Sequence, residues 1–225
     1  MPDASPPRPG PPPHWAEDAE RWLADDLALL TRDEGWTPVR TDVWRRAMPQ
    51  DPNAMFRWRL DLAAPADLVF EVFVRRIVDY HRYFTKEFVS AEQVLDLGPD
   101  AQIVHQRFRG VFPFRPRDLC HINVARALPD GRLLCSNRPV ETVPTAPGHV
   151  RLRWWGASLC VPGDRPGTSV LWYLDQENAG GMIGAWLLDL LMERTFLEEH
   201  RSRLVAFFQD GGPAELRAAL GHGEG

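Results

Sequence analysis

Polar side chains recur on one face of a predicted strand at residues 119–127. The odd positions of this strand include His121 and Asn123, whereas the even positions are apolar, with Cys120, Ile122 and Val124. Because side chains alternate between the two faces of a strand, His121 and Asn123 share a face. On a face that lines an internal cavity, they could orient the polar end of a bound molecule. On a solvent-exposed face they would need no function, and the Cys-Ile-Val face would be the packed one.

Arg107 raises the same question in the preceding predicted strand, residues 102–109, where it shares a face with Ile103 and His105. A buried arginine needs a carboxylate or a ligand as its partner, whereas an exposed arginine needs neither. Trp154 and Trp172, from two later strands, are large enough to form the wall of a pocket or part of an ordinary core. The sequence alone leaves these alternatives open.

Motifs for other chemistry are absent from the sequence. No Gly-x-Ser-x-Gly string and no motif that pairs cysteine with histidine indicates a nucleophilic enzyme. The seven histidines are scattered, without a His-Glu-x-x-His spacing, and no Cys-x-x-Cys pair occurs. Gly180, Gly181 and Gly184 lack the lysine and the acidic partner of a nucleotide-binding loop. We therefore predict no catalytic residue, no metal and no cofactor.

The composition limits the possible partners and compartments. The 225 residues carry a net charge of −5 without a basic stripe, which argues against nucleic-acid binding. Cys120, Cys135 and Cys160 are widely spaced, so we expect reduced, buried side chains. The first residues contain no apolar stretch of the kind found in signal peptides. These features predict a cytoplasmic protein, which we expect to be a monomer.

One long helix is expected to organise the chain, over residues 180–209. Between Met182 and Met192 only Gly184 and Asp189 interrupt an apolar run, which is too short for a membrane span of about 20 residues. The helix either packs on a sheet as a core element or covers a cavity with one face toward a ligand. In the second case it would contribute five lining residues: Met182, Trp186, Leu187, Leu190 and Leu191. Asp189 is expected to face water rather than the cavity.

The rest of the chain is predicted to be mainly strands, from its short alternating segments and regular turns. Residues 1–13 contain seven prolines and are expected to form a disordered tail, and an amphipathic helix follows over 14–31, with Asp26 as the one misfit on its apolar face. A second helix begins at Pro65, residues 79–84 form a short helix or turn, and 211–225 form a tail with a short helix. The predicted strands cover 36–48, 55–63, 88–97, 102–109, 119–127, 132–140, 149–161 and 168–176.

These elements predict an α+β fold. An antiparallel sheet of about eight strands must curl, and its concave face needs an element to fill it. The long C-terminal helix is large and apolar enough for that role. We therefore expect a curved antiparallel sheet wrapped around one long helix.

Three local strings resemble the START family, the lipid-transfer domains of the helix-grip, or Bet v 1-like, superfamily. Pro116-Arg117-Asp118-Leu119 resembles the family's P-R-D-F string between two strands. Residues 168–172 (TSVLW) with 177–180 (ENAG) are similar to its T-x-L-x-W strand and D-x-x-G exit into the last helix, with Glu177 where aspartate is usual. Residues 63–70 (AAPADLVF) resemble the start of its second helix. The resemblance is to bacterial-type single-domain members and assigns residues 14–210 to one lipid-binding domain.

Two positions depart from the family's pattern. Gly181 stands where a tryptophan often follows the last glycine. Asn123 occupies the position at which the pattern of some sterol-binding members has a buried arginine. The second departure argues against a buried arginine–carboxylate pair and against a sterol ligand.

The resemblance implies a tunnel between the sheet and the last helix that holds one lipid, sterol or similar apolar ligand. The protein would be a non-enzymatic carrier or sensor, and its last helix could touch a membrane transiently. The predicted lining combines the polar candidates Arg107, His121 and Asn123 with Trp154, Trp172 and the five helix residues.

Two other functions remain open. The superfamily includes polyketide aromatase/cyclases, for which His81, His105, His121 and Arg107 would be the acid–base and orienting candidates. Alternatively, the domain could be a ligand-gated interaction module that docks through its proline-rich tail.

Overall fold

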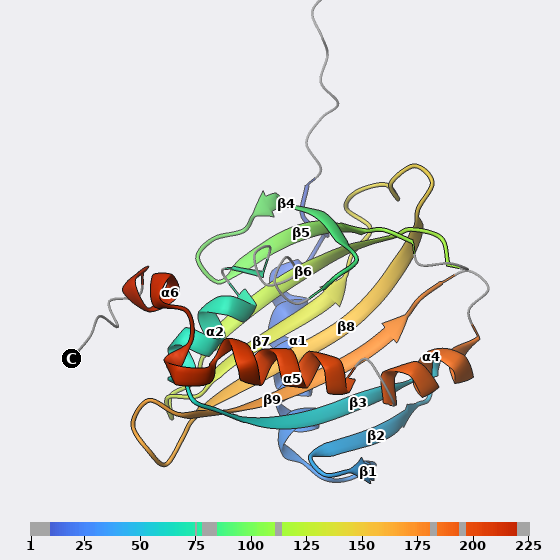
Figure 1. Cartoon of the computed structure of the whole chain (residues 1–225). Helices are drawn as coiled ribbons and strands as arrows, with labels where there is room; N and C mark the ends of the chain where they lie inside the picture. The colour runs from blue at the N-terminus through green and yellow to red at the C-terminus, as the bar shows by residue number, and fades with distance from the viewer. Residues whose placement is uncertain are drawn as a thin grey trace, which may run out of the picture.

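Nine strands form one sheet in the residues that the structure, a computed structural model, describes: 10–74, 76–77, 85–110, 114–180, 184–193 and 197–219 (Figure 1). Their order across the sheet is β1-β2-β3-β9-β8-β7-β6-β5-β4, and neighbours in this order are antiparallel. The strands are β1 (Thr37–Arg40), β2 (Val43–Met48), β3 (Asp51–Leu62), β4 (Phe88–Asp96), β5 (Ala101–Phe108), β6 (Arg117–Ala127), β7 (Leu133–Pro139), β8 (Val150–Pro162) and β9 (Ser169–Asn178).

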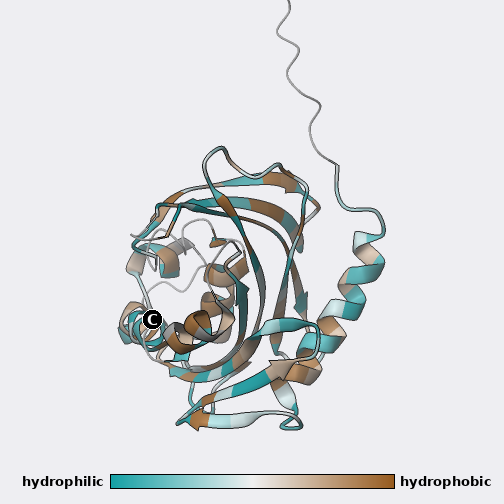
Figure 2. Ribbon diagram, turned by 90° about the vertical axis from the view of Figure 1, so that its right-hand side faces the viewer, coloured by the Kyte–Doolittle hydropathy of each residue, from teal (hydrophilic) through white to brown (hydrophobic). Residues whose placement is uncertain are grey.

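Helices cover both faces of this curved sheet. Figures 1 and 2 show α2, α4 and α5 on the concave side and α1 on the convex side. The helices are α1 (Trp15–Thr31), α2 (Ala66–Val74), α4 (Ala185–Leu191), α5 (Leu197–Phe207) and α6 (Ala214–Ala219). None of the helices in the described ranges is long and apolar enough to cross a membrane. The predicted α+β class and the curved sheet around C-terminal helices are confirmed.

Strand alternation divides the core into two layers. The concave layer joins Trp58 and Leu171 of the sheet to Leu204 and Phe208 of the C-terminal region, and all four are buried. The convex layer joins Leu23 and Leu30 of α1 to the even face of β6. Cys120 lies in the convex layer, and Cys135 and Cys160 lie in the concave one, so the predicted burial of the cysteines is confirmed.

Two elements that were predicted as continuous are each divided into two shorter ones in the structure. The strand predicted over 36–48 is split into β1 and β2 by a turn at Asp42, which has a left-handed φ of 58°. The long helix predicted over 180–209 begins at Ala185, because Gly180 has a φ of 62° and Gly184 is extended. Within the described residues it consists of two helices, α4 and α5. The predicted element at 79–84 and most of the predicted tail at 1–13 lie outside the described residues.

Asp26, the predicted misfit on the apolar face of α1, is fully buried and fastens the helix to the convex face. Its two carboxylate oxygens accept hydrogen bonds from Arg138 at 2.7 and 2.9 Å. The carboxylate also accepts from Ser136 Oγ at 2.5 Å and from Trp155 Nε1 at 2.9 Å. A buried charge is tolerated when it is paired and hydrogen-bonded in this way.

Asp118 has a similar role on the convex face at the other end of β6. It is fully buried, and Arg151 donates to both of its oxygens at 3.1 and 3.0 Å. The Ala146 backbone N–H and His105 Nε2 lie 2.8 and 3.0 Å from Oδ2. Burial alone would raise the pKa of Asp118, but these hydrogen bonds outweigh it and hold the pKa below its usual value. The carboxylate thus joins β5, β6, β8 and the loop before β8.

We predict that Asp26→Ala lowers the free energy of unfolding by about 3–5 kcal/mol, because it leaves Arg138 buried without its carboxylate. Urea denaturation would measure the change. The neighbouring exposed Asp25 offers a matched control, and Asp25→Ala should change stability by less than about 0.5 kcal/mol. Equal effects of the two substitutions would contradict the anchoring role of Asp26.

Candidate functional site

A row of side chains crosses the concave face at the end where β6 lies directly beside β8. The parallel pairing of these strands aligns Leu119 with Leu152, which places His121 next to Trp154. The two rings meet edge to face, with centroids 5.2 Å apart. Trp154 lies opposite Glu177 of β9. The sheet register therefore brings residues from three strands to one place.

The indole of Trp154 is held in one orientation. Its Nε1 donates to Asp175 Oδ1 at 2.9 Å, and Asp175 lies opposite Gly156 in the β8–β9 ladder. The ring extends over Gly156, where an added Cβ would lie only 2.2 Å from an indole carbon. Glycine is thus required at position 156 for the tryptophan to reach the carboxylate.

His121 and Gln106 bring hydrogen-bonding capacity into the concave layer without using it. Both side chains are fully buried. Neither ring nitrogen of His121 and neither amide atom of Gln106 has a hydrogen-bond partner among the described residues. Burial lowers the pKa of His121 to about 3, so the ring is neutral at physiological pH. Each unmade hydrogen bond costs about 1–3 kcal/mol, so these groups are suited to bind a polar ligand atom.

Asp175 and Glu177 add two carboxyl groups to the same face. Burial and the neighbouring Glu177 raise the pKa of Asp175 well above its usual range, although the Trp154 hydrogen bond acts in the opposite direction. Burial raises the pKa of Glu177 to about 7. Both side chains are half-buried rather than fully covered. A group that changes charge near neutral pH can act as an acid or base, or can pair with a cation.

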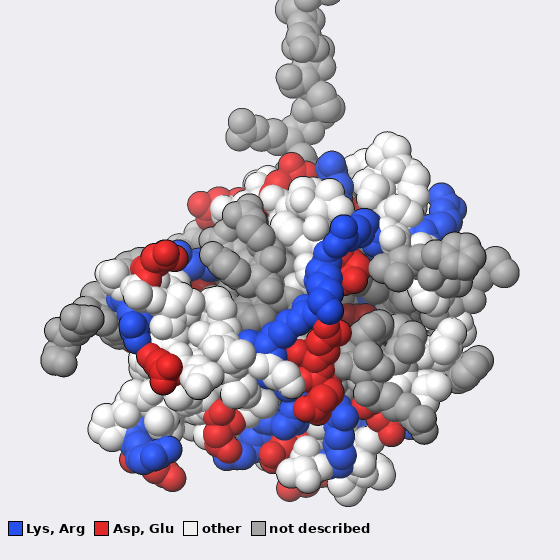
Figure 3. All heavy atoms as spheres, in the orientation of Figure 1, with Lys and Arg blue, Asp and Glu red and all other residues white. Residues whose placement is uncertain are grey.

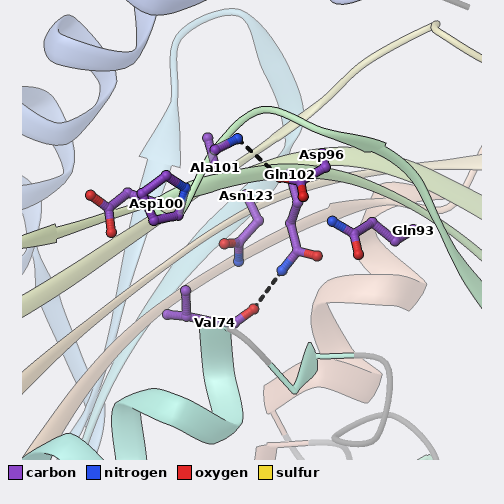
Figure 4. A pocket seen from close by; sticks show the side chains of 9 residues that line it. Val74, Gln93, Asp96, Asp100, Ala101, Gln102 and Asn123 are labelled. Carbon is purple, nitrogen blue, oxygen red and sulfur yellow. Dashed lines mark hydrogen bonds between the residues drawn. The ribbon is translucent and has the colours of Figure 1, made fainter.

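Asn123, a predicted ligand residue, mainly supports α2. Its Nδ2 donates to Asn137 Oδ1 at 2.9 Å and lies 3.4 Å from the Phe73 carbonyl oxygen. Gln102 Nε2 donates to the next carbonyl, that of Val74, at 2.6 Å (Figure 4). The two amides therefore satisfy carbonyl groups at the C-terminal end of α2. The Oδ1 atom of Asn123 has no partner within the described ranges.

A pocket beside Asn123 opens between the end of α2 and the β4–β5 turn (Figure 4). Its volume of about 180 Å³ is smaller than the roughly 300–1,000 Å³ of typical small-molecule sites. Most of its wall is polar or backbone. It is lined by Val74, Gln93, Asp96, Gly98, Pro99, Asp100, Ala101, Gln102 and Asn123. This pocket is too small and too polar to enclose a lipid.

The C-terminal helices are fastened over the concave face by ion pairs at its edges. Asp189 of α4 is buried, pairs with Arg45 of β2 at 2.8 Å and accepts from the Ala54 backbone N–H at 3.1 Å. The expectation that Asp189 faces water is therefore wrong. On α5, Glu199 pairs with Lys86 at 2.7 Å. Figure 3 shows acidic and basic atoms side by side across this face of the molecule.

His200 of α5 points from this cover toward the sheet. Its ring lies against Trp58 and Tyr173, with centroid distances of 5.7 and 6.4 Å. Burial, with a smaller contribution from Arg203, lowers the pKa of His200 to about 4. The helix therefore presents a neutral imidazole to the aromatic part of the concave layer.

Three of the predicted site residues do not line the concave interior. The Arg107 side chain is 44% exposed and lies 3.6 Å from Glu92, because odd positions of β5 point to the convex side. Trp172 points to the convex side and stacks on Trp44, at a centroid distance of 5.6 Å. The third is Leu190, which is 37% exposed, whereas Leu187 is half-buried and its place in the site stays a prediction.

Other predictions have mixed outcomes. His121, Asn123 and Trp154 are buried on the concave side. His105, an acid–base candidate, lies on the convex side beside Asp118, so it cannot reach the concave interior. Met182, His81 and the side chains of Trp186 and Leu191 lie outside the described residues.

Sequence patterns did not indicate Gln106, Asp175 or His200 as site residues, and they indicated no chemical role for Glu177. Alternation along β9 contained the signal for Asp175, since Leu171, Tyr173 and Asp175 share a face. No local pattern marked Gln106 or His200, whose neighbours come from distant strands. In the described part of the chain, no three His, Cys, Asp or Glu side chains gather as a metal site would require.

Solved structures share this architecture. The human StAR-related lipid transfer protein 5 matches with a TM-score of 0.72 at 16% identity, over 85% of this chain and 97% of that chain. A STAR-related lipid transfer protein from Xanthomonas axonopodis matches with a TM-score of 0.63 at 24% identity, over 76% and 99%. The Zhui aromatase/cyclase from Streptomyces sp. R1128 matches with a TM-score of 0.51 at 15% identity, over 76% and 98%. No family model and no curated protein matches the sequence.

The raised pKa of Glu177 predicts that the free energy of unfolding depends on pH. The pKa of this side chain is about 4.3 in the unfolded chain and about 7 in the folded protein. Between these two pH values the folded protein therefore binds the proton more tightly than the unfolded chain does. The contribution of Glu177 to the free energy of unfolding should therefore fall as pH rises from about 4 to about 7 and change little above it. Because the side chain is half-buried, we expect a loss on the order of 2 kcal/mol.

Urea titrations of the parent and Glu177→Gln across this pH range would measure the effect. The variant cannot ionise at position 177, so its free energy of unfolding should fall less than the parent's between about pH 4 and pH 7. The exposed Glu17 offers a control, and Glu17→Gln should retain the parent's slope. A parent-like slope in Glu177→Gln would contradict the prediction.

Proposed function

Because the chain has the helix-grip fold of START domains, we propose that it binds one amphipathic small molecule between the concave face and the C-terminal helices. The observation that carries this proposal is the unused hydrogen-bonding capacity of His121 and Gln106 in an apolar layer. A protein gains stability by removing such groups unless they have a task. Binding the polar end of a ligand is a task that fits their burial.

The apolar part of the ligand would lie along the concave layer toward α5. This layer contains Phe56, Trp58 and Leu171, which are buried against helices rather than against another sheet. Apolar contact contributes about 25 cal/mol for each Å² removed from water, so a hydrocarbon chain would supply most of the affinity. The polar row would then select the head group.

A lipid is the ligand class that the comparisons favour. Two of the similar structures are lipid transfer proteins by name, although the likeness itself concerns the fold. The protein would act as a carrier or sensor, without catalysis. A ligand could enter when α4 or α5 moves, since edge ion pairs such as Lys86–Glu199 involve exposed side chains that separate at low cost. A cytoplasmic, monomeric protein that touches membranes transiently remains our expectation.

Native mass spectrometry of the purified protein, followed by solvent extraction, tests the proposal directly. We expect a copurified amphiphile at one molecule per chain, or binding of one after exposure to a lipid panel. A protein that is empty and binds no member of the panel would overturn the proposal.

Two glutamines on the same face of β5 provide a sharper prediction. Gln106→Leu removes an unpartnered amide, so we expect it to raise the free energy of unfolding by about 1 kcal/mol while weakening ligand binding. Gln102→Leu breaks the bond to the Val74 carbonyl and should lower the free energy of unfolding by about 1–2 kcal/mol. Denaturant titration and ligand titration of both variants would measure these changes. A destabilised Gln106→Leu with unchanged affinity would show that the amide is structural.

A second candidate function is polyketide cyclisation and dehydration. It is favoured by a specific observation: His121 and the carboxyl groups of Asp175 and Glu177 flank Trp154 on the concave face, where an acid–base pair would have to lie. The Zhui aromatase/cyclase shares the fold. A ligand-gated interaction module would rest on the proline-rich tail, most of which lies outside the described residues.

Turnover of a poly-β-ketone substrate distinguishes the enzyme from the carrier. For a carrier we expect no product from the parent protein above the uncatalysed rate. Product formation that His121→Ala abolishes and Arg107→Ala leaves intact would replace the carrier proposal, because Arg107 lies outside the concave interior. Liquid chromatography with mass detection would measure the products.

A further inference from the structure

Asp175 and Glu177 lie two residues apart on the concave face of β9, between β3 and β8. No ion pair joins either carboxyl group to a basic side chain in the part of the chain that the structure describes. The Trp154 indole is the hydrogen-bond donor to Asp175, and it is uncharged. Among the described residues, the two carboxyl groups therefore form an acidic pair without a cationic partner.

Three described arginines on neighbouring elements have partners elsewhere. Arg45 of β2 pairs with Asp189 of α4. Arg117 of β6 donates to the Ala179 carbonyl at 2.9 Å and to the Arg115 carbonyl at 2.6 Å. Arg153 of β8 is exposed and lies 3.5 Å from Glu141.

Two described imidazoles that face the concave layer add no positive charge. His121 of β6 is neutral, because burial lowers its pKa to about 3. His200 of α5 is also neutral, with a pKa of about 4. Nearby Arg203 pairs with Glu199. The concave site thus presents negative charge whenever the acidic pair ionises.

Asp189, at the same end of the sheet, is a carboxylate whose hydrogen bonds are satisfied, and it serves as a comparison for Asp175 and Glu177. It has an arginine partner at 2.8 Å and a backbone N–H at 3.1 Å. Asp175 and Glu177, which are half-buried, have neither an arginine nor a lysine partner among the described residues. Carboxylates in low-polarity surroundings attract a cation far more strongly than carboxylates in water do.

We propose that this site selects ligands whose polar end is a primary ammonium group, held by Asp175 and Glu177 beside His121. This inference rests on the proposed function and names the class of its ligand: a long-chain amine. A primary ammonium has three N–H donors, which is enough to bond both carboxyl groups and one further acceptor. A quaternary ammonium lacks these donors, and an anionic head group would be repelled by the acidic pair.

Three ligands with the same ten-carbon chain test the proposal: decylamine, decanol and decanoate. Isothermal titration calorimetry at about pH 8 would compare them above the pKa of Glu177, which is about 7, while the amine stays protonated. We expect decylamine to bind at least about tenfold more tightly than decanol, and decanoate to bind most weakly. Glu177→Gln and Asp175→Asn should each reduce decylamine affinity about tenfold and leave decanol affinity nearly unchanged.

The exposed Asp25 provides the matched control, since Asp25→Asn removes one charge from the convex side and should change none of the three affinities. Decanol binding also reports whether each variant is folded. Equal affinities for the amine and the alcohol in the parent, or a parallel loss of both in the variants, would overturn the selectivity. Failure of all three ligands to bind would overturn the proposed function together with this inference, whereas decanol binding without amine preference would overturn the inference alone.

Discussion

A hydrogen-bonding group that is buried without a partner destabilises a protein by about 1–3 kcal/mol, and this penalty separates two carboxylates on the convex face of the sheet from two side chains on its concave face. On the convex face, Asp26 and Asp118 are fully buried and each accepts several hydrogen bonds. On the concave face, the side chains of His121 and Gln106 are equally buried and have no partner in the described residues. The convex face is therefore built to hold the fold together. The concave face retains unused hydrogen-bonding capacity, and the proposed ligand would use it.

The convex layer also supplies the rigidity that a binding site needs. Arg57 of β3 is almost fully buried there, with its guanidinium 4.8 Å from the ring centre of Trp44 and 5.4 Å from that of Trp172. Its Nη atoms also reach Asp33 at 2.6 Å and the Arg32 carbonyl at 2.7 Å. These contacts tie β3 and β9 to the end of α1. The same two strands carry the concave layer on their other face, so the outer contacts keep the inner surface in place.

Alternation and helical spacing were sufficient to predict the α+β class, α1 and most strand positions. They could not show which face of each strand is concave, because that depends on long-range pairing. In β6 the pairing places His121 on the concave face, whereas in β5 it places Gln106 on the concave face and Arg107 on the convex face. Asp26 was read as a misfit because its partners, Arg138 and Trp155, come from strands over 100 residues away. Charged residues in an apolar pattern are informative only when their partners are known.

Gly156 has a consequence for how this site can change over evolutionary time. The glycine leaves room for the Trp154 indole, and the indole in turn reaches Asp175. A side chain at position 156 would displace the ring, which would take the donor away from the carboxylate. A smaller residue in place of Trp154 would leave a groove above Gly156 and an unpaired Asp175. Related chains should therefore keep these three residues as a set or replace them together, so that their covariation would identify proteins with the same interior chemistry.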